Sequence, residues 1–152
     1  MSIRTKLQDL GLEVPVAAKP VAAYVPAVQT GTLIFTAGQL PLVDGQMVST
    51  GKVGIDVDVE RAKQLAKICA LNCLAAVETI VPIEKIVRIV RVVGYVNGGA
   101  GFTSQPAVVN GASELFVSLW GEAGKHARSA IGVAELPLDA PVEIELTVEV
   151  QV

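Results

Sequence analysis

Aromatic residues are scarce in this chain of 152 residues, because they make up only 4% of it. A core with so few rings must be packed from Val, Ala, Leu and Ile, and a hydrophobic content of 51% is ample for one domain. The sequence has no apolar run of the roughly 18 residues that a membrane-spanning helix needs, and its first residues lack an apolar signal core. We therefore expect a single domain over residues 1–152 that is cytoplasmic and has no membrane partner.

Motifs for metals and organic cofactors are also missing. His126 is the only histidine, and two cysteines with one histidine do not make a zinc cluster. Neither G-x-G-x-x-G nor a P-loop is present. Cys69 and Cys73 lie four residues apart on an apolar helix face, which indicates packing as reduced thiols rather than redox chemistry. We expect no metal and no cofactor; a serine nucleophile with a histidine base would use Ser129, and nothing in the spacing favours it.

Positive charge is too sparse to favour nucleic acid as a partner. Twelve Lys and Arg residues face fifteen Asp and Glu residues, so the formal net charge is -3. Phosphate binding needs a basic surface. The sequence leaves room for a local basic patch, but it predicts no nucleic-acid partner.

What the sequence does contain is a very regular alternation at its end. Apolar residues alternate there with polar ones: Val142, Ile144, Leu146, Val148 and Val150 with Glu143, Glu145, Thr147, Glu149 and Gln151. A period of two over ten residues predicts a half-buried strand with one aliphatic face and one face that carries three carboxylates. A strand that begins at Arg128 precedes it, across a Pro-containing connection at 136–141. We expect Arg128 and one glutamate, on neighbouring strands, to lie across one site.

The other elements are predicted from caps, breakers and periodicity. In chain order they are a helix at 2–12, strands at 24–28 and 32–36 around a turn at 29–31, a turn at Asp44-Gly45, a helix from Asp56 or Asp58 to Pro82, a strand at 85–96, and a helix from Ser104 to about Trp120. This order predicts an α+β or mixed α/β sandwich with two long helices on one sheet face.

Two interpretations of Arg128 and the glutamates remain open on periodicity alone. In the first, the glutamates project from a solvated sheet face and Arg128 makes a surface ion pair. In the second, Arg128 binds a substrate carboxylate through the two parallel donors of its planar guanidinium. One glutamate would then position water or transfer protons.

Several motifs make the chain similar to the RidA (YjgF) family of small imine deaminases. They are Ala127-Arg-Ser-Ala130, Val133-Ala-Glu-Leu-Pro137, Val142-Glu-Ile-Glu145, Phe35-Thr-Ala-Gly-Gln-Leu-Pro41, Tyr24-Val-Pro-Ala-Val28 and Val109-Asn110-Gly111. The resemblance covers roughly residues 20 to 150. A short N-terminal helical extension at 1–14 and a longer loop at 97–106 are additions, which indicate a divergent subgroup.

The resemblance implies a chorismate-mutase-like fold and a homotrimer with sites in the clefts between subunits. Arg128 would bind the carboxylate of a 2-imino or 2-enamino acid, and Glu143 matches the acidic residue near the attacking water. Tyr24 and Asn110 match residues that line the pocket, and Gly38 would let the backbone approach the ligand. No metal or organic cofactor is implied.

The chain departs from the family pattern at two positions. Ala37 stands where the best-known members carry Ser, and Ala130 where they often carry Cys. We therefore keep three interpretations of function: hydrolysis of imines to 2-keto acids and ammonia, a module that binds small carboxylates without significant turnover, and a ribonuclease or translation inhibitor. The acidic charge and the lack of a His-based acid–base pair disfavour the third.

Overall fold

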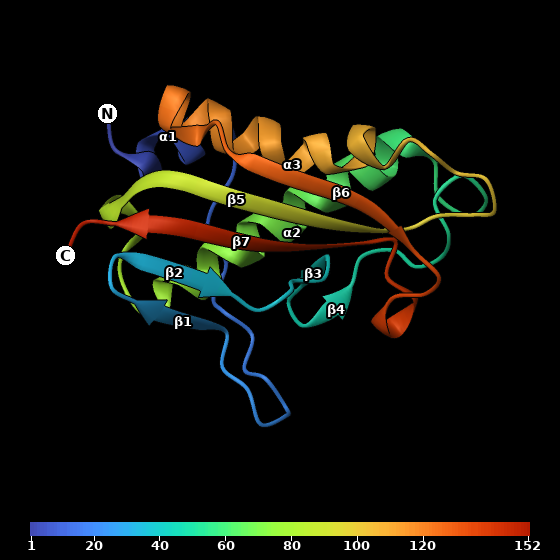
Figure 1. Cartoon of the computed structure of the whole chain (residues 1–152), viewed down its shortest axis with the longest axis horizontal. Helices are drawn as coiled ribbons and strands as arrows, with labels where there is room; N and C mark the ends of the chain where they lie inside the picture. The colour runs from blue at the N-terminus through green and yellow to red at the C-terminus, as the bar shows by residue number, and fades with distance from the viewer.

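In the computed structural model, which describes residues 1–152, the closing alternation forms a central strand of the sheet (Figure 1). This strand is β7 (Val142–Val150), and its apolar side chains are at most 2% exposed. It pairs with β2 on one side and with β5 on the other. Each buried aliphatic side chain contributes about 1.5–3 kcal/mol, so this face of β7 holds the sheet to the helices.

The sheet has five strands in the order β1-β2-β7-β5-β6. The strands besides β7 are β1 (Ala27–Thr30), β2 (Leu33–Thr36), β5 (Ile86–Asn97) and β6 (Ala127–Val133). β5 and β6 are parallel, and the other neighbours are antiparallel, so the sheet is mixed. A separate small hairpin, β3 (Leu42–Val43) and β4 (Gln46–Met47), encloses the predicted turn at Asp44-Gly45, where both residues have positive φ.

Two long helices, α2 (Val59–Glu78) and α3 (Gln105–Trp120), cover one face of the sheet, as predicted (Figure 1). α2 begins at Asp58, whose carboxylate accepts a hydrogen bond from a first-turn amide. α3 begins at Ser104 and has a proline in its first turn. The helices touch at Gly111, where a Cβ atom would lie 1.9 Å from the carbonyl oxygen of Lys63. The two backbones therefore pack directly on one another.

Shorter elements close the ends of this layer. α1 (Ile3–Asp9) packs on α3, with Lys6 Nζ donating to the Leu119 carbonyl at 2.7 Å. The Trp120 indole donates to the Ile86 carbonyl at 3.2 Å, which ties the end of α3 to the start of β5. The 3₁₀ turns are η1 (Ile83–Lys85), η2 (Gly121–Gly124) and η3 (Pro137–Asp139). No helix here is both long enough and apolar enough to span a bilayer.

The first hairpin differs from the prediction of a strand at 24–28 and a turn at 29–31. Only two residues, Gly31 and Thr32, join β1 to β2, and Gly31 has φ +58°. A two-residue hairpin turn needs positive φ at its first position, which glycine adopts without strain. The turn therefore sits at Gly31, and residues 24–26 lie outside the sheet.

The expected adjacency of the arginine and glutamate strands is wrong, because β5 lies between β6 and β7. β6 follows the α3 crossover and pairs in parallel with β5. The chain then returns through η3 and pairs with the other edge of β5 in the antiparallel direction. Alternation along a strand predicts which face a residue occupies, but it carries no information about which strand lies beside it.

Candidate active site

Arg128 lies on the helix-covered side of the sheet, on the edge strand β6. Its register partner is Val92, which in turn pairs with Leu146, and both are buried. Arg128 Nη1 donates to Asn110 Oδ1 at 2.7 Å and to Ser113 Oγ at 3.2 Å. None of the five ion pairs includes Arg128, so a surface ion pair is the wrong interpretation. Nε and Nη2 have no partner in the chain, which leaves two donors for a ligand.

Asn110 and Ser113 reach Arg128 together because residues three apart share one face of a helix. Ser113 Oγ also lies 2.9 Å from His126 Nε2, and His126 Nδ1 lies 2.6 Å from the Gly124 carbonyl. Partial burial, with a smaller effect of the Arg128 charge, lowers the pKa of His126, while the bond to Gly124 opposes that shift. Ser113 was not among the site residues predicted from the sequence; its spacing from Asn110 was the available signal.

Gly38 and Glu143 form a second contact, on the open face of the sheet. Gln39 and Ile144 exchange backbone hydrogen bonds of 2.8 and 3.0 Å just beyond β2, which brings Gly38 beside Glu143. A Cβ atom at Gly38 would lie 2.2 Å from Glu143 Oε1, so only glycine leaves the carboxylate in this position. Burial, and then the charge of Glu145, raises the pKa of Glu143.

Glu145 shares the open face but is already engaged. Its carboxylate accepts a hydrogen bond from the Tyr95 hydroxyl. This hydrogen bond, with burial, raises the pKa of Tyr95 to about 12. No side chain of the same molecule hydrogen-bonds to Glu143, so the two glutamates are not equivalent.

The Arg128–Asn110 pair and the Gly38–Glu143 pair lie on opposite faces of the sheet. Cross-strand partners share a face, and successive residues of a strand alternate between faces. Arg128 is in register with Leu146 through Val92, whereas Glu143 is three residues from Leu146 on the same strand. An odd separation places Glu143 on the other face. One chain therefore does not bring the predicted site residues together.

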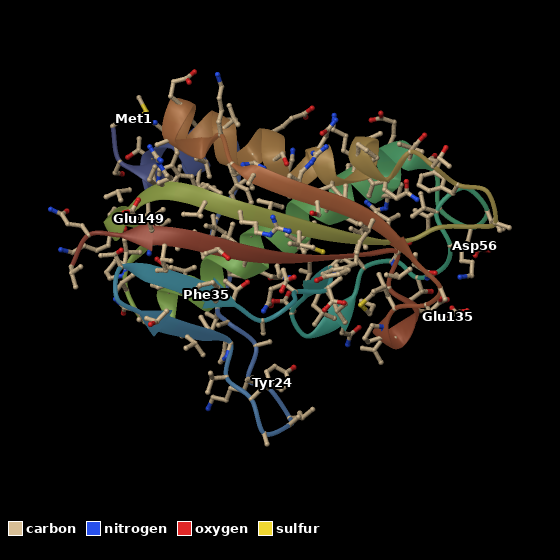
Figure 2. All side chains as sticks on the ribbon, viewed as in Figure 1. Met1, Tyr24, Phe35, Asp56, Glu135 and Glu149 are labelled. Atoms are coloured by element: carbon tan, nitrogen blue, oxygen red, sulfur yellow. The ribbon has the colours of Figure 1, made fainter.

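Tyr24 belongs to neither pair. It is 58% exposed and projects with the segment at 20–26 away from the sheet (Figure 2). Ala130 is in register with Gly94 and lies two residues after Arg128 on β6, so its methyl group is on the same face as the guanidinium. No cluster of three or more His, Cys, Asp or Glu side chains is arranged to hold a metal ion.

Known proteins of similar sequence extend over almost the whole chain. Protein TCP17 of Trypanosoma cruzi is 38% identical over 149 residues, which cover 97% of this chain and 93% of that protein. A 2-iminobutanoate/2-iminopropanoate deaminase of Dermatophagoides farinae is 31% identical over 140 residues, which cover 92% of this chain and 95% of the relative.

Solved structures agree with the fold. Protein Atu1372 of Agrobacterium tumefaciens, described as having unknown function, is 42% identical with a TM-score of 0.92 and covers 98% of this chain and 92% of that one. YjgF of E. coli is 27% identical with a TM-score of 0.65, over 98% of each chain. A family model described as YjgF/chorismate mutase-like, putative endoribonuclease, matches residues 4–150. The chain belongs to the YjgF/RidA family, whose chorismate-mutase-like α+β fold it shares.

Proposed function

We propose that this protein hydrolyses 2-imino and 2-enamino acids to 2-keto acids and ammonia, at sites formed between the subunits of a homotrimer. The observation that carries the proposal is the separation of the Arg128–Asn110 and Gly38–Glu143 pairs onto opposite faces of one sheet. The arginine pair of one subunit would meet the glutamate pair of the next across an interface. The deaminase name of the Dermatophagoides farinae relative supports the reaction class.

Arg128 would bind the substrate carboxylate. Asn110 and Ser113 hold its Nη1, and Nε and Nη2 are the two free donors that a carboxylate accepts side by side. A carboxylate oxygen on each donor fixes the plane of the substrate, and with it the face of the C=N bond. The guanidinium thus orients the substrate as well as attracting its carboxylate.

Glu143 would serve the attacking water. A carboxylate with a raised pKa is a stronger base than an ordinary glutamate, so it takes a proton from water more readily. The water oxygen adds to the imine carbon while Glu143 takes one water proton and returns it to the nitrogen, which gives a carbinolamine. Glu143 then takes the remaining hydroxyl proton and passes it to the nitrogen, so that the C–N bond breaks and the 2-keto acid and ammonia are released. The main contribution to the rate is then proximity, because Glu143 and Arg128 hold the water and the imine carbon in the reacting geometry.

The open face of the sheet supports assembly. Its exposed apolar side chains include Val28, Phe35 and Ile131, which are 54%, 42% and 45% exposed. Exposed apolar surface of this kind marks interaction sites, and a neighbouring subunit would cover it. We also propose a cytoplasmic location, which the two free cysteine thiols support.

Ala37 and Ala130 favour the alternative of a binding module without significant turnover. Both replace polar groups with methyl groups, so fewer side chains orient the substrate. Endoribonuclease activity, which the family description contains, is not proposed. The only histidine is bonded to Ser113 and Gly124, and no second histidine is present to complete an acid–base pair.

The test of turnover uses imino acids generated in situ by an amino-acid oxidase. We expect the protein to accelerate ammonia release from some members of an aliphatic, aromatic and acidic panel. No acceleration with any member, together with binding of 2-keto acids, would establish the binding module instead.

The test of the shared site mixes two variants that are each expected to lose most of the activity. Arg128→Ala and Glu143→Gln chains are co-expressed with different tags, and mixed oligomers are purified by both tags. If each site takes Arg128 from one subunit and Glu143 from the next, every mixed trimer contains one intact site, so about one third of the sites is restored. No recovered activity, or a stable monomer by light scattering at micromolar concentration, would contradict a site between subunits.

A further inference from the structure

Ser113 and His126 form a hydrogen-bonded pair to which the proposed imine hydrolysis gives no chemical step; there Ser113 only helps to hold Arg128. The Gly124 carbonyl, 2.6 Å from His126 Nδ1, can only accept a hydrogen bond. The ring proton of the neutral imidazole must therefore sit on Nδ1. Nε2 is left with its lone pair facing Ser113 Oγ at 2.9 Å, so the serine hydroxyl donates to it.

This geometry contains the three parts of an activated nucleophile. A hydroxyl lies within hydrogen-bond reach of a base, and a third group orients the base. The third group is here a backbone carbonyl instead of a carboxylate. Phe116 packs edge-on against the imidazole, with ring centroids 6.2 Å apart, and so restrains the ring further. Partial burial lowers the pKa of His126, which keeps the ring neutral and able to take a proton.

Arg128 adds a positive charge at the same hydroxyl. Its Nη1 lies 3.2 Å from Ser113 Oγ, close enough to stabilise negative charge that develops on the serine oxygen or on an attacked carbonyl. The Ser113 and His126 side chains are both partly exposed, so an acyl group can approach them.

We propose that Ser113 and His126 are a nucleophile–base pair for acyl transfer from small carboxylic esters. Ser113 Oγ bonds to the ester carbonyl carbon while its proton passes to His126 Nε2. The C–O bond of the ester breaks, and the leaving alkoxide takes that proton from His126 and departs as the alcohol. Water, deprotonated by His126, then hydrolyses the acyl-serine to the carboxylic acid and regenerates the hydroxyl. This reaction differs from the imine hydrolysis proposed above, although Arg128 and Ser113 contribute to both sites.

Other serines in the chain lack these neighbours. Ser129, whose spacing in the sequence did not favour a His-assisted nucleophile, lies on the opposite face and accepts a hydrogen bond from Arg91. Ser118, on the same helix as Ser113, donates to the Leu115 carbonyl. Neither contacts an imidazole, so both serve as matched controls.

The test is acylation of the whole protein by p-nitrophenyl acetate. We expect a burst of nitrophenolate that approaches one per chain, and one acetyl group on the tryptic peptide that contains Ser113. Ser113→Ala and His126→Gln should each reduce the burst by at least about tenfold. Ser118→Ala and Ser129→Ala should leave the burst unchanged.

A second variant covers the case in which Ser113→Ala does not fold. Ser113→Cys keeps the shape, and its thiol should be acylated at the same position, again dependent on His126. Two results would overturn the proposal: absence of acylation at position 113 in both the wild type and Ser113→Cys, or an undiminished burst in His126→Gln. Glu143→Gln separates the two activities, because it should remove imine hydrolysis while acylation persists.

Discussion

The two faces of β7 share one backbone but differ in burial and in the kind of side chain that they carry. On one face, five aliphatic side chains are packed under α2 and α3 and are at most 2% exposed. On the other, Glu143, Glu145, Thr147 and Glu149 remain partly accessible, and one of them has a pKa raised by its surroundings. Alternation along one strand therefore places the packed side chains on one face and the residue of the proposed chemistry on the other. Substitutions one residue apart should therefore affect different properties.

The largest expected effect is on turnover, from Glu143→Gln. Loss of an acid–base group costs about 10²- to 10⁴-fold in rate, while the neutral isostere should spare binding of a 2-keto acid. Glu145→Gln is the matched control on the same face, and it should matter much less because Tyr95 already engages that carboxylate. The coupled ammonia assay and calorimetric binding measure both effects. An equal loss of turnover in the two variants would mean that Glu143 has no special role in the reaction.

The next largest expected effect is on the free energy of unfolding, from Leu146→Ala on the covered face. Truncation of a fully buried leucine should lower the free energy of unfolding by about 2–5 kcal/mol, since it removes burial and leaves a cavity. Thr147→Ala, one residue on and on the open face, should stay within about 0.5 kcal/mol. Chemical denaturation at one fixed protein concentration compares them. Similar losses would mean that the open face is as tightly packed as the covered one.

Arg128→Ala should weaken 2-keto acid binding by about 1.5–3 kcal/mol, or about 10- to 150-fold, because a charge-assisted pair is lost. Arg128→Lys keeps the charge but not the planar pair of donors, so it should also bind more weakly than the wild type. The same exchange in Arg91→Lys, on the open side of β5, is the control. Unchanged calorimetric affinity in Arg128→Ala would mean that Arg128 is only a structural partner of α3.

The smallest effect is on stability as a function of pH. The folded-state pKa of Glu143 is raised, so its charged form is disfavoured in the native state. The folded protein therefore loses stability as the pH rises from the pKa of Glu143 in the unfolded chain through its pKa in the folded protein. Glu143→Gln should be slightly more stable than the wild type near neutral pH and equal to it at pH values below the ordinary 4.5. A variant that is less stable at neutral pH would mean that the carboxylate stabilises the fold.

The sequence predicted the elements that local chemistry determines. The alternation at 142–151 gave β7 and its faces, Asp58 and Ser104 gave the starts of the long helices, and Asp44-Gly45 gave a hairpin turn. These signals depend on residues within a few positions of one another. They were correct because capping, turn geometry and periodicity need no partner from elsewhere in the chain.

Features that depend on distant partners could not be predicted in this way. The insertion of β5 between β6 and β7 separates Arg128 from the glutamates, and no local pattern encodes it. The contact of Ser113 with His126 crosses from α3 to the segment after η2, so only the folded chain brings the two together. Carboxylate binding by Arg128 was one of two interpretations of the residues themselves, and the roles of Glu143, Tyr24, Gly38 and Asn110 came from family resemblance. All of these roles stay predictions.

The bond between Trp120 and Ile86 gives the molecule an internal optical reporter. Trp120 is the only tryptophan, it is partly buried, and its indole is fixed to the first residue of β5. Intrinsic fluorescence therefore monitors the docking of the helix layer on the sheet at a single known point. Glu143 lies at the far end of the sheet from this point, because it pairs with Tyr95 near the end of β5. Unfolding should shift the emission spectrum, whereas Glu143→Gln should leave the spectrum of the folded protein unchanged.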